Sequence, residues 1–294
     1  MALRGNLRVY LGMAPGVGKT FAMLNEGRRR LERGADVVVG VVETHGRPLT
    51  QERLENLPIL PRKEMTYMGR TFTEMDIDAI LARKPHIVLV DELAHTNISG
   101  SRNEKRWQDV EEILAAGVDV ISTVNIQHLE SIHDVVEKIT GISQSETIPD
   151  LFLRQADQVE IVDITPEALH RRMAHGNIYA ADKIDAALAN YFRIGNLSAL
   201  RELALLWVAD KVEEGLQKYR KNEGISELWE SQEKIVVAVN DSAEGETIIK
   251  RAARIAARSL GSKLFALHIL QNDGITISDS SMLTKIERLT ISLG

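Results

Sequence analysis

The chain of 294 residues is 44% hydrophobic, which is ample for packed cores and suggests about two domains. Its formal net charge of −6 argues against nucleic-acid binding through a basic surface, and the absence of cysteine excludes disulfides, zinc–thiolate sites and a cysteine nucleophile. No apolar run approaches the roughly 20 residues that cross a bilayer and no signal-peptide core opens the chain, so we expect a cytoplasmic protein.

Short β-branched runs alternate with helical patterns along residues 1–221, which predicts an α/β first domain with a parallel sheet flanked by helices, as in P-loop NTPases. The expected strands are Leu7–Leu11, Asp36–Val42, His86–Val90, Val118–Thr123 and Gln158–Asp163. The expected helices are Lys19–Arg33, Thr73–Ala82, Asn103–Ala116, Gln127–Thr140 and Pro166–Ala174. A long amphipathic helix over Ser198–Lys221 ends this domain.

A polar stretch, residues 222–232, is predicted to be a linker, and the alternation restarts after it. Apolar Ile235–Val239, a helical pattern over Thr247–Leu260 and a second apolar run, Lys263–Leu270, predict one βαβ unit. Residues 233–294 are few for a domain of this type. We therefore expect them to be the start of a second α/β domain in a longer protein.

The most informative stretch lies between the first expected strand and the first expected helix. It reads Gly12-Met13-Ala14-Pro15-Gly16-Val17-Gly18-Lys19-Thr20. Glycines in such a loop let backbone N–H groups turn toward phosphate oxygens, and the helix that follows aims its positive end at the same anion. Lys19 would reach the β- and γ-phosphates, and the Thr20 hydroxyl would hold Mg²⁺. The stretch therefore predicts that ATP and Mg²⁺ bind here, against Gly12, Pro15, Gly16, Val17, Gly18, Lys19 and Thr20.

One position departs from the usual spacing, Gly-x-x-x-x-Gly-Lys-Ser/Thr. Its first glycine would stand at position 13, where this chain has Met13, and Gly12 comes one place early. The remainder of the motif, from Pro15 to Thr20, is intact. The alternative interpretation, a glycine-rich turn with a surface lysine, is disfavoured by the strand before the loop and the helix after it.

The third expected strand ends in two acidic residues, Asp91 and Glu92. At the carboxyl end of a buried parallel strand, Asp91 would face the P-loop across the ligand crevice and hold Mg²⁺, directly or through water. Glu92 is a candidate general base for an attacking water, although a site that only binds nucleotide does not need one. An ordinary strand-to-loop exit remains the alternative for this acidic pair.

Polar clusters also follow the neighbouring strands. Arg47, Arg102, Asn125 and Gln127 are candidates to contact the γ-phosphate or to position water. Ordinary turn and helix-start roles remain open for Asn125 and Gln127, and an exposed basic face explains Arg102 as well. The histidines lack the helical spacing of metal ligands.

Four segments carry a resemblance to a known family, namely Glu43–Arg47, Asp91–Asn97, Arg106–Val110 and Asn125–Ser131. With the P-loop, they make residues 3–221 similar to the N-terminal cytoplasmic region of the KdpD family of bacterial potassium-responsive sensor histidine kinases. The methionine at position 13 is shared by that family. From about residue 233 the chain resembles the start of the universal-stress-protein-like domain that follows in such proteins.

The resemblance implies a regulatory input region. ATP at the P-loop would bias the kinase/phosphatase balance toward a response regulator during potassium limitation or osmotic stress. The membrane helices and the kinase core come later in such proteins, so this chain alone is not expected to phosphorylate histidine; weak ATPase activity and homodimerisation are left open. In relatives the second domain can bind nucleotides, including cyclic di-AMP in some. The expected glycine-rich nucleotide signature is missing from this chain, and Asn240-Asp241-Ser242 is a weak candidate for the first binding loop.

Two other functions stay open at this point. A free-standing P-loop phosphotransferase or NTPase would turn over a small molecule with magnesium, and Lys19→Ala would abolish that turnover. A pure interaction domain with a degenerate P-loop would depend instead on the long helix Ser198–Lys221, on Trp107 and on Trp229.

Overall fold

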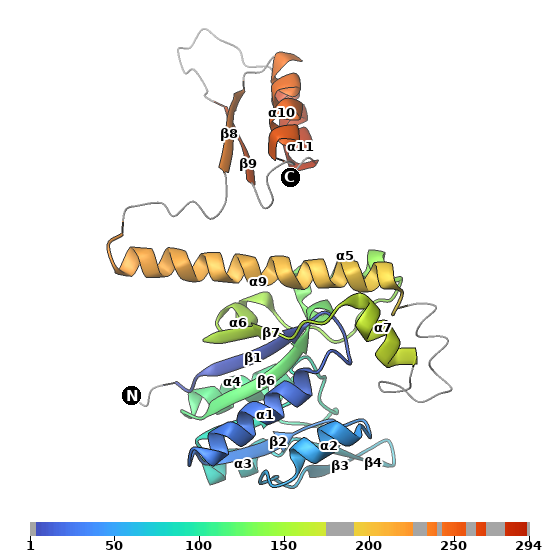
Figure 1. Cartoon of the computed structure of the whole chain (residues 1–294). Coiled ribbons are helices and arrows are strands. Elements are labelled where there is room, and N and C mark those ends of the chain that lie inside the picture. Colours follow the sequence, from blue (N-terminus) through green and yellow to red (C-terminus); the bar gives the residue numbers. More distant parts are fainter. Residues whose placement is uncertain are drawn as a thin grey trace. The chain divides into compact units, whose positions relative to one another are not determined.

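The computed structural model describes residues 4–174, 191–225, 234–239, 243–256, 263–268 and 280–292. The chain divides into two compact units, Met1–Tyr219 (unit 1) and Arg220–Gly294 (unit 2). Unit 1 is built on a five-stranded parallel sheet in the order β2-β5-β6-β1-β7 (Figure 1). These strands are β1 (Leu7–Gly12), β2 (Val37–Val41), β5 (Ile87–Val90), β6 (Asp119–Asn125) and β7 (Gln158–Ile161). The predicted α/β fold with a parallel sheet flanked by helices is confirmed.

The helices of unit 1 lie around this sheet. They are α1 (Lys19–Glu32), α2 (Pro48–Leu54), α3 (Ile77–Arg83), α4 (Arg106–Ala115), α5 (His133–Thr140), α6 (Asp150–Arg154), α7 (Pro166–Ala174) and α9 (Ile194–Asn222). A separate antiparallel hairpin is formed by β3 (Lys63–Tyr67) and β4 (Arg70–Glu74).

Neighbouring residues of the central strands enter two hydrophobic cores, one on each face of the sheet. Tyr10 and Leu89 pack in the core that contains Leu24 of α1, whereas Val88 belongs to the core that contains Leu200 of α9. Side chains of a strand point alternately to the two faces, and here both faces are buried. This is why the strands read as continuous apolar runs rather than as alternating patterns.

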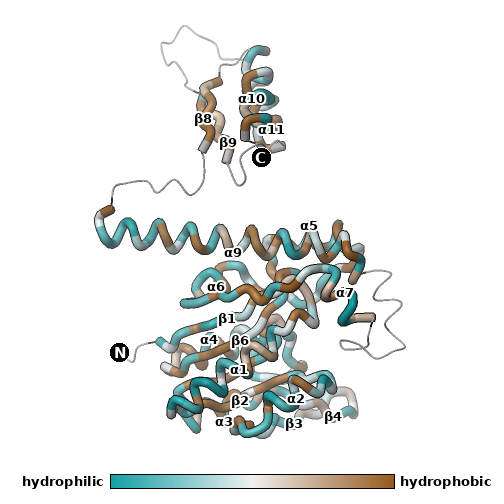
Figure 2. Tube along the Cα trace, in the orientation of Figure 1, coloured by the Kyte–Doolittle hydropathy of each residue, from teal (hydrophilic) through white to brown (hydrophobic). Residues whose placement is uncertain are grey.

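Helix α9 is the long amphipathic helix that the sequence predicts, and it begins earlier than expected, at Ile194. Its buried side chains are Leu197, Leu200, Ala204 and Trp207. In contrast, Leu206 is 54% exposed. Figure 2 shows hydrophobic and hydrophilic bands recurring along α9, as expected for a helix with one buried face.

Two expected helices begin four or more residues later in the structure. The helix expected from Thr73 begins only at Ile77, because the Asp76 side chain caps it by accepting a hydrogen bond from the Ala79 N–H at 3.0 Å. The helix expected from Gln127 is replaced at its start by two 3₁₀ turns, and α5 begins at His133. Here the Glu130 N–H bonds to the Ile148 carbonyl instead of to a helical partner.

Unit 2 contains a parallel strand pair, β8 (Lys234–Val239) and β9 (Lys263–His268), with helices α10 (Ala243–Ala256) and α11 (Ser280–Ser292). Its small core includes Val239, Ile249 and Ile286. The candidate loop at residues 240–242 and residues 226–232 of the predicted linker lie outside the described residues. No helix in the described ranges is long and apolar enough to cross a membrane.

Candidate nucleotide-binding site

A cavity of about 1110 Å³ opens in unit 1 at the carboxyl ends of β1, β5 and β6. This is the edge at which open parallel sheets bind ligands. The predicted site residues that line it are Pro15, Gly16, Val17, Gly18, Lys19, Thr20, Arg47, Asp91, Glu92, Asn125 and Gln127. Gly12 is the last residue of β1 and is not one of the residues that line the cavity.

The backbone of the loop from Gly12 to Thr20 explains both the sequence motif and its departure from the usual spacing. Gly16 and Gly18 have φ of 88° and 113°, in the region that glycine adopts without strain. A Cβ on Gly12 would lie 2.6 Å from Val17 Cγ2, so this close approach requires a glycine. Met13 is 1% exposed in the core, and its φ is not positive, so its position needs no glycine.

Lys19 is a buried cation held by neutral oxygens. Its Nζ donates to the Ala14 carbonyl at 3.1 Å and to Asn125 Oδ1, and the residue is 8% exposed. Burial lowers the pKa of Lys19 to about 8, although the nearby Asp91 carboxylate opposes this shift. Among the residues that the structure describes, Lys19 forms no salt bridge. A buried charge of this kind is costly, and an anion placed beside Lys19 would stabilise it.

Thr20 and Asp91 meet at the same point of the cavity. The Thr20 hydroxyl lies 3.2 and 3.1 Å from the two carboxylate oxygens of Asp91, which is 1% exposed. The Thr123 hydroxyl and the Glu43 N–H also donate to this carboxylate, while burial raises its pKa. A hydroxyl and a carboxylate are oxygen ligands that suit Mg²⁺. Thr20 and Asp91 are therefore the residues that would hold the metal.

Glu92 and His45 both line the cavity, and their side chains contact each other. Both residues have left-handed backbone conformations, with φ of 54° and 49°, which are strained for residues other than glycine. His45 Nε2 lies 3.2 Å from Glu92 Oε1; this contact raises the pKa of His45 and lowers the pKa of Glu92. A carboxylate with a lowered pKa, already engaged by a partner, is a weak general base.

The side chains of two predicted site residues, Arg102 and Gln127, are bonded to other side chains of the protein. Arg102 is not brought to the cavity, because its guanidinium pairs with Asp78 at 2.9 Å and with Glu112 at 2.6 Å. Gln127 lines the cavity, but its amide donates to Gln144 at 3.1 Å and accepts a hydrogen bond from the Tyr191 hydroxyl.

Arg172 of α7 also lines the cavity, and sequence reasoning missed it. Its Nη1 lies 3.3 Å from the Gly16 carbonyl and 3.4 Å from the Val17 carbonyl, so the positive charge of Arg172 lies directly against the glycine-rich loop. The only local signal was a basic residue near a helix end, which usually reflects the helix dipole. An apolar wall completes the cavity, formed by Phe21, Ala22, Pro48, Leu49 and Val162.

A family model described as the osmosensitive K⁺ channel His kinase sensor domain, KdpD, matches residues 3–212. The Sensor protein KdpD of Mycobacterium tuberculosis (strain H37Rv) is 58% identical over 291 residues, which are 99% of this chain and 34% of that protein. The Sensor protein KdpD of Escherichia coli (strain K12) is 48% identical over 266 residues, 90% of this chain and 30% of that protein.

A putative sensor protein KdpD of Synechocystis sp. (strain PCC 6803) is 46% identical over 288 residues, which are 98% of this chain and 75% of that protein. The chain spans about a third of the length of the mycobacterial and Escherichia coli relatives. The family model covers most of unit 1, and the similarity to the relatives extends over nearly the whole chain. This chain belongs to the KdpD family.

Proposed function

We propose that unit 1 binds Mg-ATP as a regulatory input module of a sensor histidine kinase. The observation that carries the proposal is the convergence of Lys19, Thr20 and Asp91 in one cavity at the carboxyl ends of the strands. A buried lysine, a hydroxyl and a carboxylate in these places are what a P-loop nucleotide site needs.

Different residues of the cavity would contact different parts of Mg-ATP. Lys19 Nζ would leave the Ala14 carbonyl and Asn125 to contact the β- and γ-phosphates. Arg172 would add positive charge next to the P-loop, and the wall that includes Leu49 would pack against an apolar part of the nucleoside. Mg²⁺, when bound, would neutralise part of the phosphate charge.

We infer the role in signalling from two observations. The chain belongs to a family of sensor kinases, and the candidate base Glu92 is already in contact with His45. With Glu92 held by His45, unit 1 would hydrolyse ATP slowly and serve as a sensor of its bound state. In the longer protein this state would shift the balance of kinase and phosphatase activity toward a response regulator, on the cytoplasmic side of the membrane, when potassium is limiting or the cell is under osmotic stress. A cyclic dinucleotide ligand for unit 2 and homodimerisation stay predictions.

Thermal unfolding tests nucleotide binding directly. Ligand at 100 times its Kd stabilises the bound fold by about 2.7 kcal/mol, which raises Tm by roughly 5–10 °C for a domain of this size. Mg-ATP should produce this shift, and Lys19→Ala with Thr20→Ala should erase it. The matched control, Arg33→Ala with Thr71→Ala, also removes one cation and one hydroxyl, both from exposed residues, and should keep it. No shift at millimolar Mg-ATP would favour an interaction domain instead.

Phosphate release separates the regulatory role from a free-standing enzyme. A rate well below the ordinary range of about 1–1000 per second supports regulation. A rate within that range, stimulated by a small-molecule acceptor and lost in Lys19→Ala, would support a phosphotransferase.

A further inference from the structure

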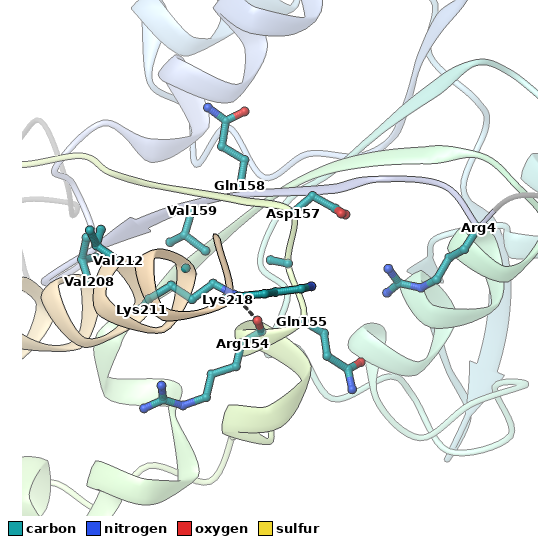
Figure 3. Close-up of a pocket in the computed structure, with 12 residues that line it drawn as sticks. Arg4, Arg154, Gln155, Asp157, Gln158, Val159, Val208, Lys211, Val212 and Lys218 are labelled. Carbon is teal, nitrogen blue, oxygen red and sulfur yellow. Dashed lines mark hydrogen bonds between the residues drawn. The ribbon is translucent and has the colours of Figure 1, made fainter. Parts of the chain in front are cut away.

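A second cavity, of about 820 Å³, lies in unit 1 away from the nucleotide site. Arg4 precedes β1, and Gln158 is the first residue of β7, so this cavity lies at the amino ends of these two strands (Figure 3). Lys211 and Lys218 of α9 line its other side. It shares no lining residue with the nucleotide cavity, which opens at the opposite ends of the strands.

The charges around this second cavity are unbalanced. Figure 3 shows the side chains of Arg4 and Lys218 extending toward each other, with the Lys211 ammonium nearby at the Arg154 carbonyl. In the part of the chain that the structure describes, neither Arg4 nor Lys218 pairs with a carboxylate. Asp157 is the carboxylate in the wall, and its Oδ2 already accepts a hydrogen bond from the Leu7 N–H at 2.8 Å.

Lys211 combines partial burial with two neighbouring cations. Burial lowers its pKa, and the positive charges of Arg154 and Lys218 lower it further, although Glu214 and Asp157 oppose them. Its Nζ donates to the Arg154 carbonyl, and the Arg154 guanidinium itself turns to Glu214 and the Trp207 ring. An anion among these cations would relieve their mutual repulsion.

The cavity also has an apolar wall, formed by Val159, Val208 and Val212. Gly215 lines it from within α9, where glycine costs about 1 kcal/mol relative to alanine. Nothing lies within 4 Å of the position that a Cβ on Gly215 would take. The absence of a side chain there keeps this part of the cavity open.

We propose that this second cavity binds a small organic phosphate, with the phosphate among Arg4, Lys211 and Lys218 and the body of the molecule against the three valines. Charge-assisted hydrogen bonds from lysine and arginine are the usual means of holding phosphate. The volume is in the range of about 300–1000 Å³ that is typical of small-molecule sites. A concave site of this size fits a soluble ligand better than a membrane surface.

The test uses the full chain and phenyl phosphate, which joins a phosphate to an apolar ring. Methyl NMR should show saturable shifts of Val159, Val208 and Val212. Lys211→Gln with Lys218→Gln should weaken the Kd by about tenfold or more, as expected when charged donors are lost. The control Arg28→Gln with Arg33→Gln makes the same change in net charge outside the cavity and should change the Kd less than about twofold.

A second variant probes the cavity itself. Gly215→Leu adds a good helix former where space is free, so the fold should persist while its side chain fills the cavity and binding is lost. Unchanged binding in this variant, equal weakening in the control pair, or equal shifts with neutral benzyl alcohol would overturn the proposal. Binding to phosphatidylglycerol vesicles without binding to phenyl phosphate would also overturn it. The Tm shift with Mg-ATP is independent of all these outcomes.

Discussion

At the scale of single residues, Lys19 gives the proposed nucleotide site a defined pH dependence. Its pKa of about 8 means that the side chain loses its proton above pH 8, whereas bound phosphates would hold the proton. Binding of Mg-ATP must then take up a proton, and affinity should fall as pH rises through 8. We expect uptake of about half a proton per ATP at pH 8 and almost none at pH 6.5.

Calorimetry in two buffers with different ionisation enthalpies measures this uptake. Lys19→Arg keeps the charge at both pH values and should show no uptake at pH 8. Uptake by the arginine variant equal to that of the original chain would assign the proton to another group and contradict this account of Lys19.

The contact between His45 and Glu92 has its own pH window. The pKa of His45 is raised above 6.5, so its contribution is complete below pH 6.5 and is lost as pH rises through the folded-state value. The pKa of Glu92 is lowered below 4.5, so its contribution is present above pH 4.5 and is lost as pH falls through the folded-state value. The pair is therefore strongest between about pH 4.5 and 6.5.

NMR titration of the His45 imidazole checks this contact. Glu92→Gln removes the charge and should lower the pKa of His45. Glu64→Gln makes the same substitution on an exposed strand residue and should leave the titration unchanged. A His45 titration that does not respond to Glu92→Gln would show that the two side chains do not interact in solution. Both are more than 40% exposed, so we expect a small effect on stability.

At the scale of elements, the sequence predicts best what is local. Strands β1, β2, β5 and β6 were found because they are mostly buried on both faces, and the loop from Gly12 to Thr20 stood out because its motif is made of consecutive residues. The β3–β4 hairpin was missed because most of its side chains are exposed, which leaves no hydrophobic alternation. Arg172 was missed because its partner in the P-loop is 156 residues away, a contact that only the tertiary fold creates.

Helix α9 offers a matched pair of leucines that tests its packing against the rest of unit 1. Leu200 is fully buried in the core, whereas Leu206 is 54% exposed. Leu200→Ala should lower the free energy of unfolding by about 2–5 kcal/mol, since it removes buried methyl groups and leaves a cavity. Leu206→Ala should change it by less than about 0.5 kcal/mol. Both variants replace leucine by alanine within the same helix. The difference in intrinsic helix propensity between the two residue types therefore cancels when the two losses of stability are compared.

Denaturant unfolding followed by circular dichroism and by tryptophan fluorescence measures both variants. Equal losses of stability in the two variants would mean that α9 is not docked through its Leu200 face. The result also bears on the second cavity, because Lys211 and Lys218 reach it only while α9 stays on unit 1.

At the scale of the whole molecule, the chain contains two units with separate cores. The two cores of unit 1 lie on the two faces of its sheet, and one of them includes α9, while the small core of unit 2 is formed by residues such as Val239 and Ile286. Both cavities are lined entirely by residues of unit 1. Ligand binding at either cavity is therefore expected to depend on unit 1 alone.

Truncation tests this independence. A chain of residues 1–222 keeps α9 to its last residue and removes most of unit 2. We expect it to unfold in one cooperative transition, because a unit with its own core folds as a domain. The Tm shift with Mg-ATP should stay within about 2 °C of the shift in the full chain, since a difference of 1 kcal/mol moves Tm by about 2–4 °C at this size. Differential scanning calorimetry of both chains makes the comparison. A truncated chain that folds but has lost the Mg-ATP shift would show that unit 2 contributes to nucleotide binding, and would contradict a site confined to unit 1.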